Sequence, residues 1–281
     1  MEPRPLTTTS PEQSTTWAGS DQTTPRSSPS RPEGAGTQRP STSSPTADGR
    51  SRHGDQSRHP SPPPIRWADR TLILGRTGTG KSQLARALIL TAPADGQRII
   101  IDPNDSTATD IPGAVTFTDP AKRTNRRGED WHAAAWARFV PTDPTDLEAY
   151  GRVYERAFAD PLAPRLVWCD EAGDVLPAHG APKHGLRYLR QGRKRQKGHF
   201  ACHTRPRAMS VDLLGQADHL VLFAMPSPAD VEHVAKTVGL ETRQLLELFR
   251  TLPEHGFLLH SQRAPGYVFR CPGLTWQAPR I

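Results

Sequence analysis

The chain has 281 residues, of which 29 are proline, and its 36 Lys and Arg against 29 Asp and Glu give a formal net charge of +7. The longest apolar runs fall far short of the roughly 18 to 20 residues that cross a bilayer, and no apolar segment follows the N-terminus, so we expect neither a membrane span nor a secretory signal. The spacing of Cys169, Cys202 and Cys271 fits neither a disulfide framework nor a zinc motif, which favours a cytoplasmic protein with reduced thiols.

Two regions of different composition divide the chain. In residues 1–64, 34 positions are Pro, Ser or Thr and few are apolar. Such a segment cannot bury enough apolar surface to offset the entropy lost when its backbone is ordered, so we expect a disordered tail. The remaining residues, 65–281, are numerous enough for one domain with a sizeable core.

Strand-like and helix-like stretches alternate along residues 65–281. Short apolar runs predict strands at 71–74, 98–102, 114–118, 137–140, 165–171, 199–204 and 219–224. Apolar spacing predicts helices at 82–90, 146–159, 228–237 and 241–252, the second capped by Thr145. Runs at 256–260 and 266–270 predict a terminal hairpin. This alternation is typical of an α/β fold in which helices flank a mostly parallel central sheet.

A phosphate-binding motif follows the first predicted strand and opens the first predicted helix. The segment matches G-x-x-x-x-G-K-[ST] through Gly75, Arg76, Thr77, Gly78, Thr79, Gly80, Lys81 and Ser82. The glycines let successive backbone N–H groups point inward around an anion. Lys81 can reach the β- and γ-phosphates of ATP, and the Ser82 hydroxyl can coordinate Mg²⁺. The alternative is a glycine-rich turn that binds nothing.

Two adjacent carboxylates end the predicted strand at 165–171. Four apolar residues precede Asp170 and Glu171, which is the Walker B pattern. Asp170 is suited to hold the Mg²⁺ shell, and Glu171 is suited to orient and deprotonate an attacking water. The alternative is that the two acids only cap the following turn. The sequence therefore predicts an ATP hydrolase with its own catalytic carboxylate.

The positive charge of the chain is concentrated in residues 183–207. This segment contains nine Lys or Arg and no acid, so its charge of +9 exceeds that of the whole chain. Such a segment matches a nucleic-acid backbone, and we expect it to bind double-stranded DNA. The alternative is a solvated helix face. Arg193 or Arg195, just before a predicted strand, could instead reach a neighbouring subunit's γ-phosphate as an arginine finger.

In this order, these motifs resemble the FtsK/HerA-type ATPases, a group of DNA-pumping, conjugative-transfer and phage packaging or morphogenesis proteins. The resemblance includes Ile-Asp-Pro at 101–103, Gly192-Arg193-Lys194, and His203-Thr204-Arg205-Pro206 at a strand end. It implies a RecA-like P-loop fold, with Arg193 acting in trans within a homo-oligomeric ring, commonly a hexamer. It also places Thr204 where the family carries a glutamine that senses the γ-phosphate, which leaves His203 and Thr204 as the polar candidates.

Three functions are compatible with these motifs. The first is a Mg²⁺-dependent ATPase that moves double-stranded DNA during transfer, segregation or packaging. The second is an ATP-dependent assembly or morphogenesis protein that acts on a protein partner. The third is a P-loop kinase with residues 187–195 as an arginine-rich lid, but Glu171 beside Asp170 favours the motor.

Overall fold

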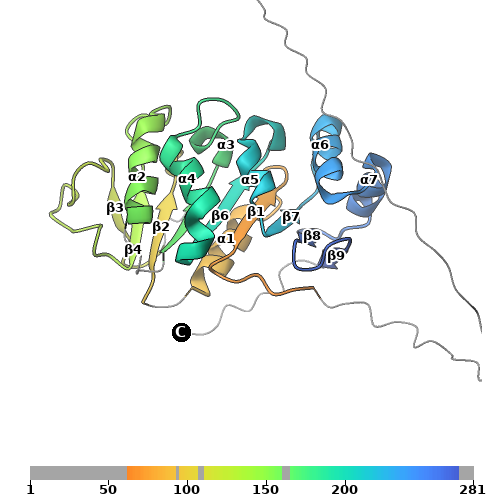
Figure 1. Cartoon of the computed structure of the whole chain (residues 1–281), viewed down its shortest axis with the longest axis horizontal. Coiled ribbons are helices and arrows are strands. Elements are labelled where there is room, and N and C mark those ends of the chain that lie inside the picture. The colour runs from red at the N-terminus through yellow and green to blue at the C-terminus, as the bar shows by residue number, and fades with distance from the viewer. Residues whose placement is uncertain (1–61, 93–94, 107–110, 160–164, 272–281) are drawn as a thin grey trace, which may run out of the picture. The chain divides into compact units, whose positions relative to one another are not determined.

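A nine-stranded sheet organises the part of the chain that the computed structural model describes, which is residues 62–92, 95–106, 111–159 and 165–271 (Figure 1). The predicted tail therefore lies, over residues 1–61, outside the described residues. The strands are β1 (Arg70–Leu74), β2 (Gln97–Ile101), β3 (Val115–Phe117), β4 (Trp136–Phe139), β5 (Arg165–Cys169), β6 (Lys197–His203), β7 (His219–Leu222), β8 (Phe257–Ser261) and β9 (Val268–Cys271). Their spatial order is β3-β4-β2-β5-β6-β1-β7-β8-β9.

The strands from β3 to β7 in this order all run parallel, and β8 and β9 continue the sheet antiparallel. Leu74 at the end of β1 is level with His203 on β6 and with Leu222 on β7. The loops that follow these neighbouring strands therefore meet at one edge of the sheet. We call this the carboxyl edge, and the opposite end of the parallel strands the amino edge.

Helices cover both faces of the sheet. They are α1 (Lys81–Leu90), α2 (Leu147–Ala159), α3 (Ala172–Val175), α4 (Lys183–Gln191), α5 (Val211–Gly215), α6 (Pro228–Val238) and α7 (Thr242–Arg250), with the short 3-10 helices η1 (Gly192–Arg195) and η2 (Pro206–Ala208). Side chains alternate between two cores: Ile73 packs in the core that includes α1, whereas Leu72 and Leu74 pack in the core that includes α2 to α7. Burial on both faces explains the nearly continuous apolar runs of the strands.

The expected α/β architecture is confirmed, with the predicted strands and the terminal hairpin in place. One local expectation is wrong, because Asp146 rather than Thr145 caps α2. The Asp146 Oδ1 accepts the Ala149 N–H at 2.9 Å, while the Thr145 hydroxyl donates to Asp143 Oδ1 at 2.7 Å. Within the described residues, none of the helices has the length and apolar character needed to cross a bilayer.

Candidate nucleotide-binding site

The glycine-rich loop connects β1 to α1 at the carboxyl edge. Gly75 lies so close to β7 that an added Cβ would come within 2.5 Å of the Phe223 Cβ. Gly78 and Gly80 have φ values of +82° and +101°, a backbone region that disfavours other residues. These conformations curl the loop around its own interior. The predicted strand, tight loop and helix N-terminus are therefore present, and we refer to residues 75–82 as the P-loop.

Lys81 begins α1 and extends its side chain back across this loop. Its Nζ donates a hydrogen bond to the Arg76 carbonyl at 3.1 Å, and the residue is largely buried. The ammonium group is thus held within the curve of the loop. Together with the N-terminus of α1, this positive charge makes the loop a suitable site for the phosphates of a nucleotide.

Ser82, in the first turn of α1, faces Asp170 at the end of β5. The Ser82 Oγ lies 3.3 Å from both carboxylate oxygens of Asp170. Asp170 itself continues the pairing of β5 with β2, since its N–H donates to the Ile101 carbonyl at 3.1 Å. A hydroxyl and a carboxylate that converge on one point are the hard oxygen ligands that Mg²⁺ prefers, so these two residues fit a magnesium ion.

Glu171 turns away from the strand into the left-handed region, with φ of 52°. Its Oε2 lies 3.1 Å from Nδ1 of His203, at the end of β6. The hydrogen bond with His203 lowers the pKa of the Glu171 carboxyl despite partial burial, and the positive charges of His203 and Lys81 act in the same direction. The carboxylate is therefore ionised at neutral pH and able to accept a proton from water.

The contact between Glu171 and His203 follows from strand register. Cys169 pairs with Ala201 across β5 and β6, so the residues two positions further along each strand come together. Gly173 makes the approach possible, because an added Cβ there would lie 2.2 Å from His203 Nε2. The sequence predicted His203 only as a candidate sensor of the γ-phosphate and did not predict its contact with Glu171. The one indication of this contact was that both residues lie at the ends of predicted strands.

A cavity of about 630 Å³ adjoins the other side of the P-loop. The glycine-rich loop, the residues that follow β7, the end of α7 and the loop after α7 line it. The lining is partly apolar, through Phe223, Phe249, Leu252 and Pro253, and partly polar, through Arg76, Thr79 and Glu254. His255 closes one wall, with its Nδ1 3.2 Å from the Thr79 carbonyl. Its volume is in the range of small-molecule sites.

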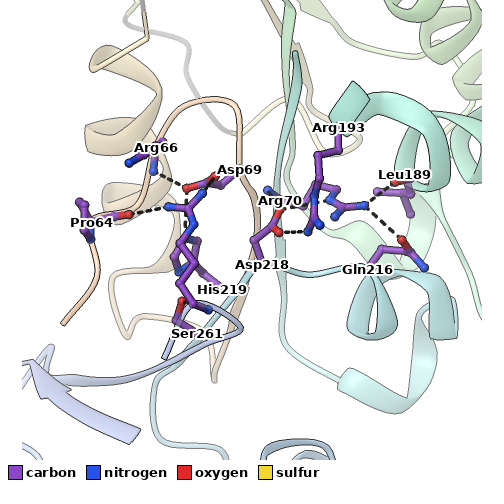
Figure 2. Close-up of polar contacts among 11 residues, drawn as sticks. Pro64, Arg66, Asp69, Arg70, Leu189, Arg193, Gln216, Asp218, His219 and Ser261 are labelled. Carbon is purple, nitrogen blue, oxygen red and sulfur yellow. Dashed lines mark hydrogen bonds and ion pairs between the residues drawn. The ribbon is translucent and has the colours of Figure 1, made fainter. Parts of the chain in front are cut away.

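Arg193 does not join this group. It lies on η1 at the amino edge, where it forms an ion pair with Asp218 (Figure 2). Asp218 also accepts hydrogen bonds from the backbone N–H and the Nε of Arg70, at 3.0 and 3.2 Å. The Arg193 side chain is nevertheless 60% exposed. Thr204 lies at the carboxyl edge, one residue beyond His203.

The basic segment 183–207 is not the single surface that its charge predicts. Strand β6 passes through the core between its two halves, and Lys197 at the start of that strand is fully buried. The cations of α4 and η1 lie on one side, and Arg205 and Arg207 lie beyond the other end of β6. A strand of this length separates the halves by about 20 Å.

No protein-family model and no curated protein matches the sequence. Among solved structures, the genome packaging NTPase B204 from Sulfolobus turreted icosahedral virus 2, in complex with ATPγS, matches with a TM-score of 0.60 and 14% identity, over 75% of this chain and 100% of its own. VirB4 of Thermoanaerobacter pseudethanolicus matches with a TM-score of 0.53 and 12% identity, over 74% of this chain and 90% of its own. The bacterial conjugative coupling protein TrwBdeltaN70 matches with a TM-score of 0.53 and 11% identity, over 75% of this chain and 86% of its own. The expected resemblance to FtsK/HerA-type ATPases is thus confirmed for the fold.

Proposed function

We propose that this chain, with the fold of packaging and conjugation ATPases, hydrolyses Mg²⁺-ATP at its carboxyl edge and uses the energy to move double-stranded DNA. The observation that carries the proposal is the convergence of Lys81, Ser82, Asp170 and Glu171 on one loop. Lys81 and Ser82 begin α1, whereas Asp170 and Glu171 follow β5, about 90 positions later in the sequence. Each of the four has the chemistry that phosphoryl transfer to water requires.

In this mechanism, the P-loop backbone and Lys81 hold the β- and γ-phosphates. Ser82 and Asp170 would hold Mg²⁺, which neutralises charge on the phosphate oxygens when it is bound. Glu171 orients a water through its free carboxylate oxygen and accepts the proton as the water attacks. His203 fixes the other oxygen at 3.1 Å, so the carboxylate has one orientation. The cavity beside Phe223 and Phe249 gives room for the nucleoside.

The proposed arginine finger requires a second copy of the chain. Arg193 lies at the amino edge, so it cannot reach the P-loop of its own subunit, whereas its exposed guanidinium can face a neighbour. A homo-oligomeric ring, with a hexamer as the expected form, would bring the two together. We expect an Arg193→Ala protein and a Glu171→Gln protein to regain turnover when they are mixed. Inactive mixtures at every ratio would contradict a shared site.

The proposal is tested by steady-state ATP hydrolysis with Mg²⁺, with and without double-stranded DNA, across a salt series. We expect DNA to stimulate hydrolysis and the stimulation to fade as salt rises, since salt weakens contacts with phosphates. Hydrolysis that is indifferent to DNA would contradict the motor and favour an ATP-dependent assembly protein that acts on a protein partner.

A further inference from the structure

A second cavity, of about 930 Å³, opens beside the P-loop at the carboxyl ends of β6, β1 and β7. Arg76 comes from the P-loop itself, Arg205 and Arg207 follow β6, and Ser227 and Asp230 belong to the start of α6. Thr204 lies between the arginines and the strand end. The cavity is therefore built by loops that follow neighbouring strands, next to the hydrolytic site, and it shares Arg76 and Thr77 with the cavity beside Phe223.

The charge around this cavity is strongly positive. Arg76, Arg205 and Arg207 are all exposed, and no ion pair within the described parts of the chain joins their guanidinium groups to a carboxylate. Asp230 is the acid in the lining, and it is largely buried. Glu232 feels the charge of Arg207, but its carboxylate is engaged by Lys236 at 2.8 Å.

The arginines of α4 and η1 differ, because each has a partner within the protein. Arg190 pairs with Asp212 at 2.7 Å, and Arg193 pairs with Asp218. Arg187 and Arg195 lie over the ring of Phe158, at 4.7 and 4.3 Å. Arginines that gather around one cavity and form no ion pair with its one lining acid, Asp230, repel each other, and a bound polyanion removes this repulsion. The carboxyl-edge arginines are thus the better candidates for an external anion.

We propose that Arg76, Arg205 and Arg207 bind the phosphates of a nucleic-acid strand in this cavity. The inference rests on the proposed function and specifies where its substrate lies. Guanidinium groups bind phosphates through paired hydrogen bonds, which suits a backbone contact without sequence preference.

This position couples the strand to hydrolysis through two short connections. Arg76 is the residue whose carbonyl accepts the hydrogen bond from Lys81. Arg205 lies two residues after His203, which contacts Glu171. A strand held by these arginines therefore contacts the loop that binds phosphate and the segment that orients the carboxylate.

The test measures binding of the full chain to a fluorescent DNA duplex, by anisotropy across a salt series without nucleotide. We expect Arg205→Ala and Arg207→Ala each to weaken binding about tenfold at low salt and to make the slope of log K against log salt shallower by about 1. Arg207→Lys, which keeps the charge, should retain the slope. Thermal unfolding of each variant verifies that it is folded.

The matched controls are Lys194→Ala and Arg187→Ala, which remove exposed cations from η1 and α4. We expect both to bind DNA with the wild-type slope. The opposite pattern, in which these two variants lose slope and the cavity variants do not, would overturn the inference and leave the proposed motor intact. Loss of ATP affinity without loss of DNA affinity in Arg205→Ala would also overturn it, by assigning the cavity to ATP. A wild-type chain that binds no duplex would instead refute the proposed function.

Discussion

At the amino edge of the sheet, two carboxylates, Asp69 and Asp218, neutralise the arginines around them, whereas at the carboxyl edge several cations surround a loop and a cavity that can receive a ligand. Arg70 is held by Asp218, by the Leu189 carbonyl at 2.8 Å and by Gln216 at 3.1 Å (Figure 2). Lys81, by contrast, is held by a carbonyl of its own loop, and Arg76 and Arg205 have no ion-pair partner in the described part of the chain.

Asp69 shows the same internal pairing at the amino edge. Burial works against its ionisation, yet the hydrogen bonds from His219 and from the Arg66 N–H, with the charge of Arg263, leave the pKa of its carboxyl below the usual value. The difference between the edges teaches that ionic groups alone do not mark a functional site. Arg70 and Asp218 satisfy each other inside the fold, whereas Arg76 and Arg205 have no ion-pair partner in the described part of the chain and are available to a ligand.

The largest effect should come from Lys81→Ala at the carboxyl edge. This variant loses the ammonium group within the phosphate loop, so we expect no measurable ATP binding or hydrolysis while the fold is kept. Isothermal titration with Mg²⁺-ATP and a turnover assay measure both properties. Normal turnover would contradict the P-loop assignment.

Glu171→Gln should lower turnover by about 10²- to 10⁴-fold and leave ATP binding nearly unchanged, because the amide keeps the shape but cannot accept the proton. Single-turnover hydrolysis and nucleotide titration separate the two effects. If turnover stays at the wild-type rate, the general base is another residue.

At the amino edge, Asp218→Ala should act on stability instead. Removing this carboxylate leaves the buried Arg70 without its ion-pair partner, so we expect a loss of about 3 kcal/mol in the free energy of unfolding. Urea denaturation measures it. Arg193→Ala, which removes the exposed partner, is the control and should cost less than about 1 kcal/mol. Equal effects of the two changes would argue against Asp218 as the centre of this network.

His199, paired with Arg70 across β6 and β1, should make the amino edge sensitive to acid. Burial, and secondarily the charge of Arg70, lower its pKa to about 3. The unfolded chain, with a His pKa near 6.5, therefore binds more protons, and stability falls as pH drops from about 6.5 toward 3. Between pH 6.5 and pH 5 we expect a loss of about 2 kcal/mol at most.

His199→Gln is the matched variant for this experiment, since its amide keeps a polar group near the Tyr154 hydroxyl, which lies 2.9 Å from His199 Nε2. Denaturation of both proteins at the two pH values should show a weaker acid dependence in the variant. Parallel pH profiles would mean that other groups cause the loss.

The smallest effect concerns His203, which positions Glu171. We expect His203→Ala to lower kcat about tenfold, the loss of one oriented hydrogen bond, with little change in KM for ATP. His203→Gln keeps a hydrogen-bond donor and should recover part of the rate. A rise in KM with unchanged kcat would place His203 in nucleotide binding instead.

Much of the carboxyl edge could be predicted because its motifs are local. The P-loop lies within eight consecutive positions, and Asp170 and Glu171 end one apolar run. The network of the amino edge could not be predicted, because its members are far apart in sequence and come together only when the strands pair. They are Asp69, Arg193, Asp218 and Arg263. The basic segment was misjudged for a related reason: linear charge density does not show that a buried strand divides the segment.

The contrast between the edges is tested most directly by thermal unfolding of the wild type, Lys81→Ala and Asp218→Ala, each with and without Mg²⁺-ATP. A ligand that binds the folded state raises Tm, so we expect a shift in the wild type and none in Lys81→Ala, whose ligand-free Tm should match the wild type. Asp218→Ala should unfold at a lower temperature but keep the shift. A lowered ligand-free Tm in Lys81→Ala, or a lost shift in Asp218→Ala, would contradict the division of roles between the two edges.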